Sequence, residues 1–208
     1  MVIKTTTVLI TLAASSLAAW AQDTGGFTLR ADAGVAFVED FEVGDSKLTF
    51  DPGFRFDIVP TYHLNQYVSF DFNTGFIWNN TDKIEGPGGS VSVEGDQWQF
   101  PFLLEATARF PLKYGLTPFI GGGGGGVYAI ANVDKIGGDR VDETDDDVFG
   151  AVQGVAGLEY RINEKFQVGL VYKYLHMFTK ETIHLPGEDV ENDNTRTHSI
   201  SLSVRVSY

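Results

Sequence analysis

An alternation of apolar and polar residues with a period of two dominates this sequence. From Ile200 to Tyr208 every second residue is apolar, and the residues between them are serine or arginine. Residues 27–35 alternate in the same way. Because successive side chains of a β-strand point to opposite faces, each such segment has one apolar wall and one polar wall. Helical periodicity is nearly absent, so the sequence predicts an all-β protein.

Eight segments fit this alternation, and the connections between them alternate in length. The segments are residues 27–37, 50–62, 67–78, 98–110, 117–131, 148–162, 166–178 and 197–208. Short turns are expected at 63–66, 111–116 and 163–165, and long polar loops at 39–49, 79–97, 132–147 and 179–196. Short turns on one rim and long loops on the other are typical of outer-membrane barrels. The sequence therefore predicts an eight-stranded antiparallel up-and-down transmembrane β-barrel, with both termini on the short-turn rim.

Strand length and the placement of aromatic residues favour a membrane barrel over a soluble one such as a lipocalin, whose apolar walls face inward around a ligand. No segment beyond the N-terminal leader is apolar for long enough to form a spanning helix, so a chain that crosses a bilayer would do so as a closed barrel. Strands of about 12 residues, at ~3.3 Å per residue and ~45° tilt, cover roughly 28 Å. Aromatic residues also gather at the strand ends, as expected of interfacial belts. The short-turn belt comprises Phe27, Tyr62, Tyr67, Phe110, Tyr160 and Tyr208, and the long-loop belt comprises Phe37, Trp78, Trp98, Tyr128 and Phe178.

Residues 1–21 are typical of a secretory signal peptide. Lys4 supplies the positive start, residues 5–18 are largely apolar or small, and Ala19-Trp20-Ala21 matches the small-x-small cleavage pattern. Cleavage is expected before Gln22, which leaves one mature barrel domain over residues 22–208. The alternative of a membrane anchor is disfavoured because the apolar run is shorter than the ~20 residues of a spanning helix.

The charge balance and the lack of cysteine exclude several classes of function. The chain has 28 acidic and 15 basic residues, a formal net charge of −13, whereas proteins that bind nucleic acid present basic faces. Without cysteine, disulfides, thiolate metal sites and a catalytic thiol are excluded. The six glycines at 121–126 lack the Lys-Ser/Thr pair and the helix of a phosphate-binding loop, and they predict a strand segment of minimal bulk. No cofactor is expected.

If the apolar walls face lipid, the polar walls line the barrel interior. Six cationic and five anionic residues then point inward, most of them in the half nearer the short turns: Arg30, Asp32, Arg55, Asp57, Asp71, Glu105, Arg109, Glu159, Arg161, Lys173 and Arg205. Unpaired charges in a narrow interior are costly, and an eight-stranded barrel has an interior that side chains just fill. We expect a structural network of ion pairs, with a gated polar pathway for small solutes as the alternative.

The half of the interior nearer the long loops is apolar instead. The residues expected to point inward there are Val38, Ile77, Leu103, Phe149, Leu175 and Met177. They predict either ordinary filling by side chains, which we favour, or a small apolar pocket open toward the cell surface.

With these features, the whole mature chain resembles the small outer-membrane β-barrel families, the OmpA-type transmembrane domain together with the OmpX/Ail/opacity-protein group. The resemblance is most specific at residues 116–123 (LTPFIGGG), 157–161 (GLEYR) and 169–174 (GLVYKY). It implies a bacterial outer-membrane location, with periplasmic termini and extracellular long loops. The C-terminal residues Val204, Val206 and Tyr208 are similar to the signal that the barrel-assembly machinery recognises in such proteins.

Neither an enzyme nor a dedicated metal site is expected. Lipid A deacylases among small barrels carry a His-x-Ser pair, whereas the four histidines here are followed two residues later by Asn65, Phe178, Pro186 and Ile200. Without a positioned base and nucleophile, covalent catalysis has no candidate. Residues 142–147 (DETDDD) leave two interpretations open: a solvated acidic loop, which the spacing favours, or weak binding of divalent cations.

The sequence thus predicts a non-enzymatic integral outer-membrane protein that supports the envelope and interacts with surface partners through acidic extracellular loops. A small porin for ions or solutes and an adhesin are the alternatives. Expected partners are outer-membrane lipid and lipopolysaccharide, the barrel-assembly machinery and an unidentified surface ligand, with no nucleic acid. The protein is expected to be a monomer.

Overall fold

The computed structural model describes residues 26–39, 41–43, 46–86, 89–136, 139–178, 182–185, 188–191 and 194–207. The predicted signal peptide at residues 1–21 and the C-terminal Tyr208 lie outside this part of the chain. In the described part, no helix has the length and apolar character needed to cross a membrane.

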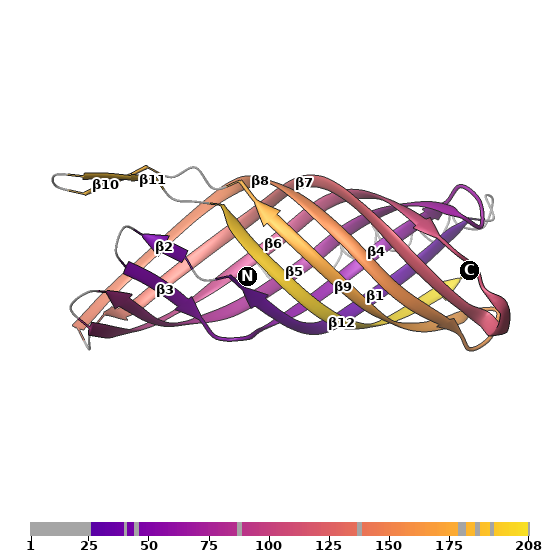
Figure 1. Ribbon diagram of the computed structural model, residues 1–208, viewed down its shortest axis with the longest axis horizontal. Coiled ribbons are helices and arrows are strands. Elements are labelled where there is room, and N and C mark those ends of the chain that lie inside the picture. The colour runs from indigo at the N-terminus through magenta and orange to yellow at the C-terminus, as the bar shows by residue number, and fades with distance from the viewer. Residues whose placement is uncertain are drawn as a thin grey trace, which may run out of the picture.

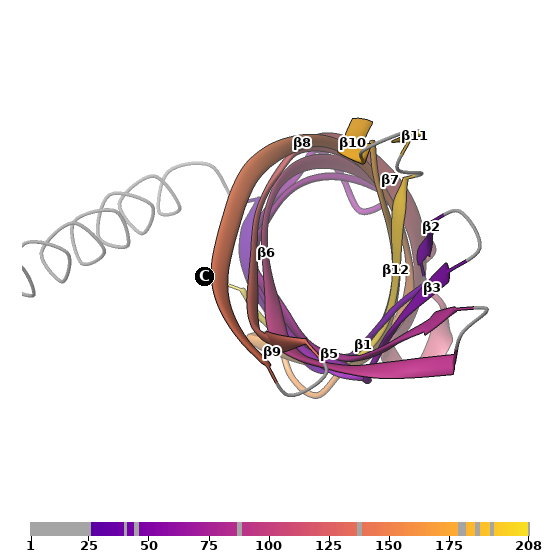
Figure 2. The same ribbon diagram turned by 90° about the vertical axis from the view of Figure 1, so that its left-hand side faces the viewer.

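Long antiparallel strands form a closed, elongated barrel, which Figure 1 shows from the side and Figure 2 from one end. Its eight strands are β1 (Phe27–Val38), β4 (Gly53–His63), β5 (Val68–Gly86), β6 (Gly89–Arg109), β7 (Leu116–Ile136), β8 (Asp139–Arg161), β9 (Phe166–Met177) and β12 (Thr195–Ser207). Each strand pairs with the next barrel strand along the chain, and β12 pairs with β1 to close the ring. The prediction of an eight-stranded up-and-down barrel is confirmed.

Both ends of the described chain lie at the short-turn rim. The backbone N–H of His63 donates to the carbonyl of Gly26 at 2.7 Å, and that of Ser207 donates to the carbonyl of Lys165 at 2.9 Å. A short 3-10 helix, η1 (Lys113–Gly115), forms the turn between β6 and β7 at this rim.

The alternation of the sequence is reproduced as an alternation of exposure. Along β12, Thr197, Ser199, Ser201 and Ser203 are buried, while Leu202 between them is 72% exposed. Along β6, Leu104 is 69% exposed and its neighbours Leu103 and Glu105 are buried. The outward face is therefore apolar and the inward face is largely polar, which suits a barrel whose surrounding solvent is hydrocarbon.

The predicted long loops at 79–97 and 132–147 are in fact extensions of the barrel strands. β5 runs on to Gly86 and β6 starts at Gly89, while β7 runs on to Ile136 and β8 starts at Asp139, so only two residues separate the strands of each pair. The prediction of irregular loops was wrong because the alternation continues there at low hydrophobicity, as in Ser90-Val91-Ser92-Val93.

Two further hairpins belong to the remaining long connections. β2 (Phe41–Val43) pairs with β3 (Ser46–Phe50), which in turn pairs with the extension of β5, for example Leu48 with Ile84. β10 (Thr182–Leu185) pairs with β11 (Glu188–Glu191) in a separate two-stranded sheet. The long-strand end of the barrel is therefore built of β-structure that reaches well past the barrel ring (Figure 1).

Aromatic side chains contact one another near both rims. At the long-strand end, ring centroids are 6.3 Å apart between Trp78 and Trp98 and 6.2 Å apart between Phe100 and Tyr128. At the short-turn end, Phe27 and Tyr62 lie 5.0 Å apart. These contacts fit the two interfacial belts expected from the sequence.

Candidate functional site: the barrel interior

The structure buries ten of the eleven charged residues that the alternation assigns to the interior. Each of the ten is at most 5% exposed: Arg30, Asp32, Arg55, Asp57, Asp71, Glu105, Arg109, Glu159, Lys173 and Arg205. They come from seven of the eight barrel strands. The barrel brings many of them into direct contact.

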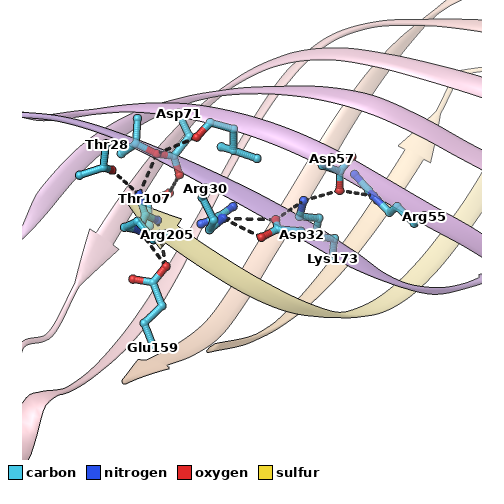
Figure 3. A network of polar contacts seen from close by, with 12 residues as sticks. Thr28, Arg30, Asp32, Arg55, Asp57, Asp71, Thr107, Glu159, Lys173 and Arg205 are labelled. Atoms are coloured by element: carbon cyan, nitrogen blue, oxygen red, sulfur yellow. Dashed lines mark hydrogen bonds and ion pairs between the residues drawn. The ribbon is translucent and has the colours of Figure 1, made fainter. Parts of the chain in front are cut away.

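One chain of contacts joins β1, β4 and β9 (Figure 3). Arg30 Nε lies 3.1 Å from Asp32 Oδ1, and Lys173 Nζ lies 2.8 Å from Asp32 Oδ2. The same Nζ lies 2.6 Å from Asp57 Oδ2, which accepts a 2.7 Å hydrogen bond from Arg55 Nε. Three cations and two anions thus alternate along one buried network.

The register explains why Lys173 is needed. Asp32 and Asp57 are direct cross-strand partners on β1 and β4, and like charges in that position repel each other. Lys173 comes from β9, on the other side of β12, and reaches both carboxylates. Its ammonium offsets the repulsion that the pairing of β1 with β4 creates.

A second cluster surrounds Glu159 near the short-turn end. Arg205 Nε donates to Glu159 Oε1 at 3.0 Å, and Arg109 Nη2 pairs with Glu159 Oε2. Arg205 Nη1 also donates to the hydroxyl of Thr28 at 2.7 Å (Figure 3) and to that of Thr61 at 2.9 Å. One carboxylate therefore holds two guanidiniums, and the cluster keeps one positive charge in excess.

Neutral side chains that sequence reasoning did not single out connect the charges. Gln153 accepts a 2.7 Å hydrogen bond from Arg55 Nη2 and donates to Glu105. Thr107 donates to Asp71 at 2.9 Å. The same alternation places these residues on the polar walls, so their inward direction could have been predicted, but their partners on other strands could not.

Phe119 is an aromatic residue of β7 that points inward among these charges. The guanidinium carbons of Arg30 and Arg109 lie 5.3 Å and 5.8 Å from its ring centroid, within the range of cation–π attraction. Sequence reasoning missed it because the glycines that follow Phe119 weaken the alternation of β7.

Arg161 is the exception to the predicted interior set, because its side chain is exposed. It is the last residue of β8, where the strand leaves the packed interior, and it lines the open mouth of the barrel. Alternation identifies the face to which a side chain belongs but not its depth, so the prediction was wrong for this position.

The interior toward the long-strand end is filled by apolar side chains. One buried cluster comprises Ala36, Ile77, Leu103, Val127, Ala151, Leu175 and Met177, with Phe149 packed against it. Five of the six residues expected there belong to this apolar layer, and the sixth, Val38, is 7% exposed and lies outside it. Their mutual contact favours filling over an apolar pocket.

Truncating the apolar layer should destabilise the barrel. We expect Leu103→Ala to lower the free energy of unfolding by about 2–5 kcal/mol, because it removes a fully buried side chain from a packed cluster. Urea unfolding of the refolded protein in lipid vesicles would measure the change. Leu104→Ala is the matched control, because the side chain of Leu104 faces outward and its truncation should destabilise the barrel much less. Equal losses of stability in the two variants would contradict the close packing of the apolar layer.

The acidic segment and the histidines were the candidates for a metal site. No group of three or more His, Cys, Asp or Glu residues in that part of the chain is arranged to hold a metal ion, and Asp145–Asp147 are exposed. His198 Nδ1 lies 2.7 Å from the Tyr172 hydroxyl and its Nε2 lies 2.8 Å from Glu39. The bonds of Glu39 to His198 and to Arg196 lower the pKa of this rim carboxyl below its usual value.

Comparison with known proteins identifies relatives of this architecture. A family model described as "Outer membrane protein beta-barrel domain" matches residues 7–207. A search of curated protein sequences found no match. Among solved structures, Neisserial surface protein A is similar with a TM-score of 0.57 and 18% identity, covering 88% of this chain and 97% of that one. OprG from Pseudomonas aeruginosa has a TM-score of 0.57 and 14% identity, covering 89% and 97%. The outer membrane protease OmpT from Escherichia coli has a TM-score of 0.51 and 7% identity, covering 89% and 98%.

Proposed function

Because the chain belongs to the outer membrane protein β-barrel family, and is thus a transmembrane protein of the Gram-negative outer membrane, we propose that it is a non-enzymatic protein for envelope structure and surface interaction. The observation that carries this proposal is the filled interior. Ten charged side chains at most 5% exposed occupy one part of it, and the apolar layer occupies the other. A barrel filled in this way offers partners its outer surface and its ends.

The long-strand end is the proposed extracellular surface. It carries the extended hairpins and the exposed carboxylates of Asp145–Asp147, while both ends of the described chain lie at the opposite rim. Outer-membrane barrels place short turns in the periplasm and longer elements outside the cell, which supports this orientation.

The proposed partners follow from the outward surface. The apolar outward face would contact outer-membrane lipid and lipopolysaccharide, and the exposed carboxylates of Asp145–Asp147 would meet an unidentified surface ligand rather than nucleic acid. The barrel-assembly machinery would recognise the C-terminal signal, of which Val204 is exposed on the outward face and Tyr208 lies outside the described residues. We propose a monomer, since each barrel strand already has two neighbours in the ring.

Single-channel recording tests this proposal. The mature chain, refolded into planar bilayers with insertion confirmed by a heat-dependent gel shift, should show no discrete conductance. The side chains of the charged network and of the apolar layer are almost inaccessible to water, so no open water path is expected along the interior. Discrete steps that scale with salt would overturn the proposal in favour of a pore.

A small channel is the second candidate, and the interior itself contains the observation that favours it. Several buried polar atoms have no hydrogen-bond partner among the described residues, including both amide atoms of Asn73, Oδ1 of Asp71 and Oε2 of Glu105. Unsatisfied buried polar groups are rare and often belong to sites that exchange water or ions. Conductance that responds to Asn73→Leu would support this alternative.

An adhesin is the third candidate. It would show saturable binding to a host or cell surface that is lost when residues 79–97 or 179–196 are shortened. The first of these segments forms the β5–β6 extension, so a shortened hairpin closed by glycine keeps the barrel strands intact.

A further inference from the structure

A cavity of about 450 Å³ opens at the short-turn rim, where the ends of seven strands and residues of two short turns enclose it. We call it the short-turn vestibule. Its lining includes Arg109, Arg161, His63, Thr28, Thr117 and Gln167. The vestibule lies at the opposite end of the barrel from Asp145–Asp147 and is separate from the surface proposed above to meet a ligand.

The charge of the vestibule is opposite to that of the chain. Among the described residues that line it there are two arginines and no acidic residue, although the protein as a whole has 28 acidic against 15 basic residues. Such a concentration of one sign in a concave site raises the local potential and attracts ions of the other sign.

The inner wall of the vestibule is a buried guanidinium. Arg109 is 5% exposed and its Nη2 is bonded to Glu159, while its Nη1 has no hydrogen-bond partner in the described part of the chain. Arg205 shares the same carboxylate, so Glu159 cannot neutralise both cations. A buried cation that keeps an unpaired donor favours an anionic partner.

The rim of the vestibule adds an exposed cation and neutral donors. Arg161 is exposed at the end of β8, free of the packed interior. Thr117 and Gln167 lie at the starts of the neighbouring strands β7 and β9, and the Thr28 hydroxyl lies 3.0 Å from His63 Nε2. An arginine with a planar fork of donors, beside hydroxyl and amide groups, matches the geometry of carboxylate and phosphate oxygens.

We propose that the short-turn vestibule binds a small oxyanion, that is, a phosphate or carboxylate group. Arg109 forms the inner contact, and Arg161 closes over the bound group from the rim. The proposal does not depend on which compartment the vestibule faces, so it can fail without affecting the proposed function.

Amide chemical shifts in ¹⁵N-labelled protein in phosphatidylcholine nanodiscs test the proposal. Inorganic phosphate and succinate are titrated separately, and saturable shifts are expected at the backbone amides of Thr28, Thr117 and Gln167. Arg161→Gln should weaken binding about tenfold, the scale of one lost charge-assisted contact, while a heat-dependent gel shift shows that the barrel is folded.

Lys113→Gln is the matched control, since Lys113 is an exposed cation on the adjacent turn that does not line the vestibule. It should leave the affinity unchanged. The same titration in phosphatidylglycerol nanodiscs identifies the source of the anion: weaker phosphate binding there would show that a lipid headgroup also occupies the site. Shifts that do not saturate, or equal losses in Arg161→Gln and Lys113→Gln, would overturn the proposal.

Discussion

Glu159→Gln should lower the free energy of unfolding by about 3–5 kcal/mol. The carboxylate accepts from both Arg109 and Arg205, and all three side chains are buried. Glutamine keeps the shape but removes the charge, so two guanidiniums would remain in a low-dielectric interior without an anion. Urea titration of the refolded barrel, followed by tryptophan fluorescence, would measure the loss.

The control for this variant is Glu164→Gln, which removes the same charge from an exposed turn at the same rim. Its effect should be below about 0.5 kcal/mol, as for most surface substitutions. If both variants unfold at the same urea concentration, the Glu159 cluster does not stabilise the barrel. A double variant that also replaces Arg205 by a neutral residue should recover part of the loss, because one of the two unpaired cations is then removed.

Gly123→Ala should destabilise the barrel severely or prevent its closure. A Cβ atom built at this position would lie 1.8 Å from the carbonyl oxygen of Leu104, a separation that no side-chain rotation can relieve because the opposing atom belongs to the backbone. β7 and β6 would have to separate, and their pairing extends from Arg109↔Phe119 through Val93↔Ile136. We expect a loss of at least about 2 kcal/mol or a failure to refold, measured as the folded fraction on a heat-dependent gel.

Gly154→Ala separates this steric effect from the general effect of adding a methyl group to a glycine strand. Gly154 lies on the adjacent strand β8, and a Cβ there would meet no heavy atom within 4 Å. The variant should be neutral or gain up to about 1 kcal/mol, because alanine restricts the unfolded chain more than glycine does. Equal destabilisation of the two variants would contradict the close approach of β7 to β6.

The barrel itself could be predicted from the sequence because the alternation that defines each strand can be seen within that strand alone. Alternation assigns each side chain to one of two faces, and the resulting apolar wall from Phe27 to Phe37 pairs with an equally apolar wall from His198 to Val206. The same argument placed ten charged residues inside the barrel. It also assigned Arg161 to the interior, since a period of two contains no information about where the packed interior ends.

The contacts between the interior charges depend on strand register and shear, which single strands do not encode. Nothing in the sequence around Lys173 indicates that it would bridge Asp32 and Asp57, which lie on strands far away in the chain. The extensions of β5 to β8 were missed for another reason: their alternation is between polar and weakly apolar residues, and outside the membrane such a pattern is common in loops as well. The alternation in hydropathy identifies strands most clearly in the segments where one face contacts lipid and is therefore strongly apolar.

The distribution of the ion pairs along the chain has a consequence for biogenesis. Arg205 on the last strand bonds to Glu159 and also to Thr28 on the first strand, a separation of 177 residues in sequence, and Lys173 reaches Asp57 across 116 residues. A partly inserted sheet that lacked its last two strands would lack Lys173 and Arg205, so Asp32 and Asp57 would face each other without the ammonium between them and Glu159 would keep only Arg109. The full set of interior contacts is therefore completed only when the seam between β1 and β12 closes, so membrane insertion should be cooperative, without stable open-sheet intermediates in the bilayer.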